Sequence, residues 1–149
     1  MPLLTEIPQE TTGKKILLVE DSAHDAALTM HALKRCGIAN AAIHVVDGGE
    51  GLALLRADLT IGLAIIDLKM PGMDGFDFLA QLGADMRLRT LPTILTTCSV
   101  LEADRVRALQ LGVSRYVVKS LDLKEYVEAL CTALTALHGA LADADPVQT

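Results

Sequence analysis

The sequence contains little of what marks several large classes of protein. It has no Trp, and aromatic residues make up only 3% of its 149 residues. Cys36, Cys98 and Cys131 include no C-x-x-C pair, which argues against a zinc site or a disulfide framework and predicts reduced thiols. No apolar run approaches the ~18 residues of a membrane span, and the N-terminus lacks the basic start and apolar block of a signal peptide. These absences predict a soluble, cytoplasmic protein.

Basic residues are also scarce. Thirteen Lys and Arg stand against nineteen Asp and Glu, giving a net charge of -6 and a pI near 5.1. Because nucleic-acid-binding proteins present clustered Lys and Arg, no direct nucleic-acid partner is expected. Hydrophobic residues are abundant, at 51% with a mean hydropathy of +0.38. This apolarity favours helices packed on both faces of a sheet, or alternatively a surface patch for self-association.

The length fits one domain with a proper core. Residues 1–13 and 142–149 are short segments without periodicity and are predicted to be flexible tails. Between them, residues 14–141 alternate between short apolar runs and helical patterns. The predicted strands are 15–20, 42–46, 62–67, 92–97 and 115–118, and the predicted helices are 23–36, 48–57, 76–84, 101–111 and 123–141.

The strand runs are apolar without alternation, which indicates burial on both faces and hence a parallel sheet. Right-handed crossovers then place helices on both sides, so the predicted class is a doubly wound α/β fold. Four predicted helices begin with a polar residue followed by an acid three positions later, as an N-cap requires. These caps are Ser22, Asp47, Ser99 and Asp122, and the glycines predicted to end helices are Gly37, Gly83 and Gly112.

The last predicted helix, 123–141, carries two apolar stripes at helical spacing. One is a row of Leu and Val. The other is made mostly of small residues: Tyr126, Ala129, Ala133, Ala136 and Ala140. The stripes fit a deeply packed helix, or alternatively a face that contacts a partner or a second copy in a homodimer.

Five polar side chains lie at or next to the carboxyl ends of the predicted strands: Glu20, Asp21, Asp67, Thr97 and Lys119. Parallel strands share one such edge, where these folds bind ligands, so the side chains should meet in one crevice. Carboxylates suit Mg²⁺, which is held by one or two of them together with phosphate oxygens. The hydroxyl and the amine can donate to phosphoryl oxygens. The sequence therefore predicts a Mg²⁺-dependent phosphoryl-transfer site with Asp67 as the attacking carboxylate.

These motifs resemble the receiver domain of two-component response regulators. The matching segments are Leu17-Leu-Val-Glu-Asp21, Ile65-Ile-Asp-Leu-Lys-Met-Pro-Gly-Met-Asp-Gly75, Thr97 and Tyr116-Val-Val-Lys119. The resemblance implies a flavodoxin-like fold with strand order 2-1-3-4-5. It also implies a signalling phosphoprotein that is no enzyme beyond Mg²⁺-dependent self-phosphorylation and self-dephosphorylation at Asp67.

The resemblance further assigns roles to individual residues. Asp67 would accept the phosphoryl group from a histidine kinase or a histidine phosphotransfer protein. Asp21 and Asp67 would bind Mg²⁺ with the backbone carbonyl of Lys69, and Glu20 would act through water. Thr97 and Tyr116 would then switch position and change the surface that a downstream protein reads.

Two positions depart from the family pattern. Ser120 stands where the family has a Pro after a cis peptide bond, and a cis bond before a non-Pro residue costs ~2.5 to 4 kcal/mol. Cys98 stands where the family has Ala. These departures keep open a receiver that works without phosphorylation. A hydrolase of the haloacid dehalogenase type is less favoured, because the second acid that its chemistry needs is replaced by Lys69.

Few residues follow the last predicted helix, so the chain is expected to be a stand-alone receiver. It is similar to the single-domain regulators that accompany bacterial phytochromes, and a chemotaxis-type regulator is the alternative.

Overall fold

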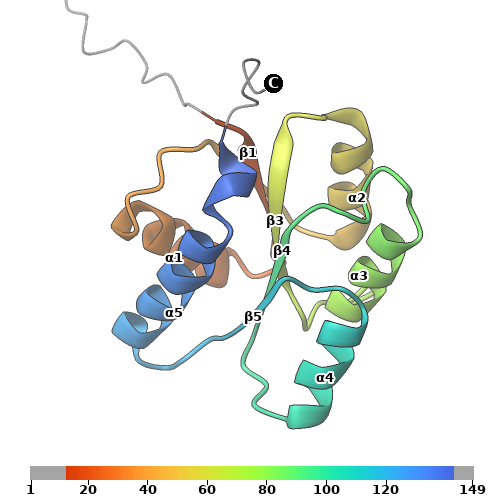
Figure 1. Cartoon of the computed structure of the whole chain (residues 1–149). Helices are drawn as coiled ribbons and strands as arrows, with labels where there is room; N and C mark the ends of the chain where they lie inside the picture. Colours follow the sequence, from red (N-terminus) through yellow and green to blue (C-terminus); the bar gives the residue numbers. More distant parts are fainter. Residues whose placement is uncertain (1–12, 143–149) are drawn as a thin grey trace, which may run out of the picture.

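The computed structural model describes residues 13–142, which form a five-stranded parallel sheet covered by helices on both faces (Figure 1). The strand order is β2-β1-β3-β4-β5, and every neighbouring pair is parallel. The strands are β1 (Lys15–Val19), β2 (Ala42–Val45), β3 (Ile61–Asp67), β4 (Thr93–Thr97) and β5 (Arg115–Val118). The helices are α1 (Ala23–Arg35), α2 (Gly48–Ala57), α3 (Gly75–Gly83), α4 (Glu102–Gln110) and α5 (Leu123–Ala136), and a 3-10 helix, η2 (His138–Leu141), follows α5. The predicted doubly wound α/β fold with order 2-1-3-4-5 is confirmed.

The core has two halves because alternate strand residues point to opposite faces of the sheet. Leu17 and Ile66 face α2, α3 and α4, whereas Ile16 and Ile65 face α1 and α5. Figure 1 shows these two groups of helices on opposite sides of the strands. All seven residues of β3 are buried, as expected for the central strand of a parallel sheet.

Most helix starts follow the predicted capping chemistry. The side chains of Ser22, Asp47 and Asp122 accept hydrogen bonds from backbone N–H groups in the first turns of α1, α2 and α5. The cap predicted at Ser99 is wrong: α4 begins after Leu101 without a side-chain cap, and the Ser99 hydroxyl donates to Asp104 instead. Ser99 is therefore part of the β4–α4 loop, and this bond connects the loop to α4.

The last predicted helix is shorter than expected. Helix α5 ends at Ala136, and the chain tightens into η2 rather than continuing as an α-helix to residue 141. The Leu141 carbonyl accepts hydrogen bonds from the Lys14 backbone N–H (3.0 Å) and the Asn40 side chain (3.0 Å). These bonds hold the end of η2 against the start of β1.

The prediction of three reduced thiols is wrong. Cys36, which caps the C-terminus of α1, forms a disulfide with Cys131 of α5 across 95 positions of sequence. Cys98 is free and exposed. No local spacing pattern signals the pair, because the fold alone brings α1 beside α5.

The small-residue stripe of α5 is not a free face. Tyr126 and Ala133 are each only 4% exposed and belong to the core beneath α1 and α5. Ala129 and Ala136 are exposed, and Ala140 lies in η2 and is half-buried. The five residues therefore do not form one partner surface, and Tyr126 and Ala133 serve the core.

The predicted tails fall almost entirely on residues 1–12 and 143–149, which lie outside the described residues. Within residues 13–142, none of the helices is both long and apolar enough to cross a membrane.

Candidate functional site

The site lies where β1, β3, β4 and β5 end, at one edge of the sheet. Asp67 is the last residue of β3 and Thr97 the last of β4, whereas Glu20 and Lys119 directly follow β1 and β5. Parallel pairing places these strand ends side by side, since Val19 pairs with Ile66 and Thr97 with Val118. Side chains that are far apart in sequence therefore meet in one crevice.

Three acids form the floor of this crevice. Glu20, Asp21 and Asp67 each offer a carboxylate oxygen, and these oxygens all lie within 4.8 Å of one another. Glu20 is 1% exposed and Asp67 6%, whereas Asp21 is exposed. Because buried carboxylates repel one another, a cluster of this kind favours a bound cation. The donor set fits a hard divalent ion that prefers oxygen ligands.

Lys119 reaches into the crevice from the opposite side. Its Nζ donates to Oε1 of Glu20 (3.0 Å), Oδ1 of Asp67 (3.0 Å) and Oδ2 of Asp25 (2.9 Å). Its side chain is only 12% exposed, so the ammonium lies largely beneath the surface. One cation thus bridges three carboxylates, which lie just after β1, at the end of β3 and in the first turn of α1.

Burial and charge shift the pKa values of these groups in different directions. Burial is the largest effect on Glu20; it outweighs the hydrogen bond from Lys119 and, with the nearby charge of Asp67, raises the pKa of Glu20 to about 7. Burial also raises the pKa of Asp67, against the opposing charge of Lys119. For Lys119, burial alone would lower the pKa, but hydrogen bonds to Asp25, Glu20 and Asp67 raise it above its usual value. The ammonium therefore stays charged at neutral pH.

Thr97 and Tyr116 are linked to each other through the backbone of Ser99, to which both side chains are hydrogen-bonded. The Thr97 hydroxyl, which is buried, accepts a hydrogen bond from the Ser99 N–H (3.0 Å). The Tyr116 hydroxyl donates to the Ser99 carbonyl (3.3 Å). The end of β4 and the middle of β5 therefore share one residue of the β4–α4 loop.

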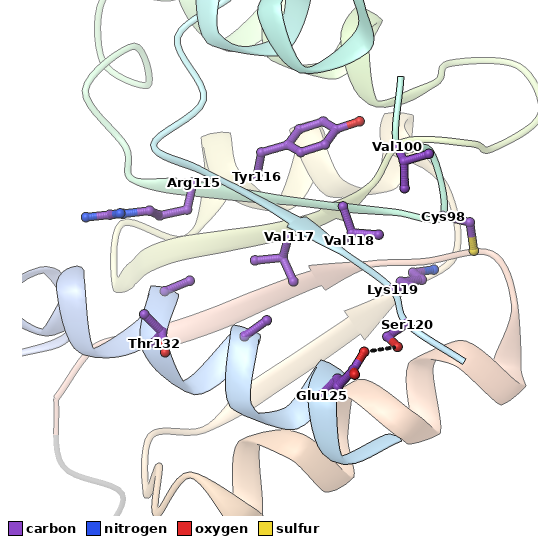
Figure 2. Close-up of a pocket in the computed structure, with 12 residues that line it drawn as sticks. Cys98, Val100, Arg115, Tyr116, Val117, Val118, Lys119, Ser120, Glu125 and Thr132 are labelled. Carbon is purple, nitrogen blue, oxygen red and sulfur yellow. Dashed lines mark hydrogen bonds between the residues drawn. The ribbon is translucent and has the colours of Figure 1, made fainter. Parts of the chain in front are cut away.

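Two loops complete the rim. After β3, Lys69 is exposed and Gly72 adopts φ +75°, a left-handed conformation that glycine accepts without strain. Asp74 then starts α3 with a capping box to Asp77. In the loop after β5, the Lys119–Ser120 peptide bond is trans, because no cis peptide bond occurs in residues 13–142. Ser120 instead donates a hydrogen bond to Glu125 (2.8 Å; Figure 2). It also accepts one from the Asp122 N–H and so caps the next turn.

Sequence reasoning missed Asp25 as a member of the site. It noted Asp25 only as the acid of the Ser22 cap, yet the side chain turns toward Lys119 while the backbone N–H serves the cap. The sequence gives only a partial signal, which is that Asp25 lies in the first turn of the helix that follows the acidic pair Glu20 and Asp21, close to the same edge of the sheet.

A parallel sheet of this order with acids, a hydroxyl and a lysine at its carboxyl edge is typical of a receiver domain, and comparison with known proteins agrees. The profile of the response regulator receiver domain matches residues 16–131, so the chain belongs to this family. It is 34% identical over 119 residues to chemotaxis protein CheY of Pseudomonas aeruginosa, covering 78% of this chain and 94% of that protein. It is 33% identical over 118 residues to response regulator Rcp1 of Synechocystis, covering 75% of this chain and 80% of that protein.

Other relatives are much longer than this chain. It is 31% identical over 105 residues to sensor histidine kinase CheAY of Helicobacter pylori, where the match spans 70% of this chain but only 13% of the kinase. The receiver family is therefore shared with proteins of different overall organisation.

Solved structures show the same likeness. The phosphorylated cyanobacterial phytochrome response regulator RcpA superposes with a TM-score of 0.74 at 30% identity, covering 83% of this chain and 92% of that one. The Mn²⁺-bound form of response regulator Rcp1 gives a TM-score of 0.72 at 30% identity, covering 84% and 94%. The predicted resemblance to phytochrome-associated regulators is confirmed.

Proposed function

We propose that this receiver accepts a phosphoryl group on Asp67 from the phosphohistidine of a histidine kinase or phosphotransfer protein, and that the modified domain signals by contact with a downstream protein. The observation that carries the proposal is the convergence of Glu20, Asp21 and Asp67 within 4.8 Å, with the Lys119 ammonium 3.0 Å from Asp67.

The chemistry follows from these positions. A carboxylate oxygen of Asp67 attacks phosphorus and forms a P–O bond, while the P–N bond of the donor breaks and its electron pair returns to the imidazole. Lys119 donates to one phosphoryl oxygen and the Thr97 hydroxyl to another, because phosphoryl transfer depends mainly on positioning and charge neutralisation.

Mg²⁺ is the proposed resident cation, held by Asp21, Asp67 and the backbone carbonyl of Lys69, with Glu20 acting through water. When bound, it supplies the positive charge that allows an anionic carboxylate to approach an anionic phosphoryl group. The existence of a Mn²⁺-bound form of the relative Rcp1 supports a divalent ion as the ligand of this receiver.

The surface response would travel through Ser99. When the Thr97 hydroxyl turns to a phosphoryl oxygen, it gives up the bond from the Ser99 N–H, and the Ser99 carbonyl is the acceptor that holds Tyr116. Tyr116 belongs to the edge strand β5 and is one of the residues that line a groove of about 650 Å³ along β5 and α5 (Figure 2). A movement of Tyr116 therefore changes an exposed surface that a partner can read.

Phosphorylation of the full chain tests the proposal. With Mg²⁺ and either a phosphorylated histidine kinase or acetyl phosphate, wild type is expected to gain one base-labile phosphoryl group, which intact-protein mass spectrometry detects. Asp67→Asn should gain none. The matched control is Asp74→Asn, which keeps an N-cap side chain at α3 and should be labelled like wild type. Label on Asp67→Asn would assign another acceptor, and label on no variant would favour a receiver that works without phosphorylation.

The switch has its own test. Beryllium fluoride with Mg²⁺ mimics an aspartyl phosphate and should shift the amide NMR signals of Thr97, Ser99 and Tyr116 in wild type. Asp67→Asn provides the control and should show no shift. Unchanged spectra in wild type would contradict the proposed coupling through Ser99.

A further inference from the structure

We propose that Asp25 is a positioning residue that holds the Lys119 ammonium beside Asp67 during phosphoryl transfer; this inference rests on the proposed function. The bond between Lys119 Nζ and Asp25 Oδ2 is 2.9 Å, as short as the bonds to Glu20 and Asp67. An ammonium has three N–H donors, and these three carboxylates use all of them.

Asp25 differs from Glu20 and Asp67 because neither a bound cation nor a phosphoryl group would compete with Lys119 for its oxygens. Glu20 and Asp67 belong to the acidic cluster suited to a cation, and Asp67 is also the proposed phosphoacceptor. Asp25 lies outside that cluster, on α1. A cation and a phosphoryl group would draw on the oxygens of Glu20 and Asp67, and Asp25 alone would keep its bond to Lys119.

The packing of α1 on α5 fixes the position of Asp25. One turn after Asp25, the buried Thr29 hydroxyl is hydrogen-bonded to the Tyr126 hydroxyl at 2.8 Å. Seven residues further on, Cys36 is joined to Cys131. Asp25, Thr29 and Cys36 follow helical spacing along one face of α1. The carboxylate is thus carried by a rigid element, which is what accurate placement of a catalytic group requires.

The ion pair is also better shielded than an ordinary surface pair. The Lys119 side chain is 12% exposed and that of Asp25 35%, so water and salt screen their attraction less than at the open surface. Because each of the three donors can serve one acceptor, Asp25 can hold Lys119 while the remaining donors turn to phosphoryl oxygens. Asp25 thereby directs Lys119 without blocking it.

Variants at Asp25 have a matched control in α2. Glu50 occupies the corresponding place there, since the Asp47 cap accepts from the Glu50 N–H as the Ser22 cap accepts from the Asp25 N–H. Both caps use the backbone N–H, which side-chain changes leave in place. The Glu50 side chain also accepts a hydrogen bond from the Val46 N–H through Oε1, and Gln keeps this acceptor. Asp25→Ala removes charge and acceptor, Asp25→Asn removes only charge, and Glu50→Gln is the control for Asp25→Asn.

The first measurement is the rate of phosphorylation of the full chain by acetyl phosphate at saturating Mg²⁺. Loss of one charge-assisted hydrogen bond should slow Asp25→Ala about tenfold and Asp25→Asn about threefold, with Glu50→Gln unchanged. The apparent Mg²⁺ affinity should stay within about twofold of wild type in all three, because Asp25 lies outside the cation cluster. A wild-type rate in Asp25→Ala, or a loss explained by weaker Mg²⁺ binding, would overturn the inference.

The second measurement does not depend on phosphorylation. The ¹⁵N NMR signal of the Lys119 ammonium, assigned with Lys119→Arg, should be protected from solvent exchange in wild type and Glu50→Gln and should broaden in Asp25→Ala. An unchanged signal in Asp25→Ala would show that Asp25 does not hold Lys119. If wild type takes up no phosphoryl group, the proposed function fails, and this signal still decides whether Asp25 anchors the ammonium.

Discussion

Glu20 is the residue whose protonation state most directly affects the acidic cluster. It is 1% exposed, and burial raises its pKa to about 7 from an ordinary value of 4.5. Between these two pH values the folded protein holds a proton on Glu20 that the unfolded chain has released. The free energy of unfolding should therefore fall as pH rises from about 4.5 to 7, by about 3 kcal/mol at most for this residue.

Urea unfolding of the metal-free protein across this pH range measures the effect. Glu20→Gln removes the titrating group while keeping an amide of similar shape, so the difference between wild type and variant should shrink with falling pH. Titrating groups that have no contact with Glu20 contribute equally to both proteins. Parallel profiles for the two proteins would contradict the raised pKa of Glu20.

For individual residues, the sequence predicts that the acids and the lysine meet in one crevice, but it does not predict every residue that contacts them. Glu20, Asp21, Asp67 and Lys119 were found because each follows an apolar strand run. Asp25 follows no strand, and its role depends on the direction of one side chain. Spacing alone could not show that this acid turns inward.

The contact between α1 and α5 is the element-scale feature that the sequence least revealed. Right-handed crossovers predict helices on both faces of the sheet, but which cysteines face each other depends on the rotation of each helix. The exposure of Ala129 beside the burial of Ala133 has the same origin, since α5 turns only part of its apolar arc toward the core. The strand boundaries, in contrast, agree with prediction within one residue, because uninterrupted apolar runs define them.

Reduction of the Cys36–Cys131 disulfide should destabilise the fold. A cross-link over a long loop restricts the unfolded chain, and its loss typically costs about 2–4 kcal/mol. Urea unfolding with and without a thiol reductant should show this difference in wild type and in Cys98→Ser. The double variant Cys36→Ser with Cys131→Ser should be insensitive to the reductant.

Thiol counting provides an independent check on this prediction. The oxidised wild-type protein, once unfolded, should react through Cys98 alone, and the reduced protein through all three cysteines. Three reactive thiols without prior reduction would contradict the disulfide.

For the whole molecule, strand order and net charge act together on the site. The order β2-β1-β3-β4-β5 brings the carboxyl ends of β1, β3 and β5 to one edge of the sheet, together with most of the candidate site residues. The net charge of -6 means that any added salt lowers the general repulsion among acids. Stabilisation by Mg²⁺ must therefore be separated from simple screening.

Specific Mg²⁺ binding should raise the free energy of unfolding by about 2.7 kcal/mol at a hundredfold excess over Kd, because only the folded chain gathers Glu20, Asp21 and Asp67. The free energy of unfolding is measured once in the presence of Mg²⁺ and once in the presence of a chelator. The ionic strength is matched, so that charge screening is the same in both measurements. Asp21→Asn should lose most of the gain; since Asp21 is exposed, the variant should still fold. Glu128→Gln removes the same charge from an exposed position on α5 and should keep the full gain. Equal losses in both variants would show that Mg²⁺ acts through net charge alone, and the acidic cluster would then not be a cation site.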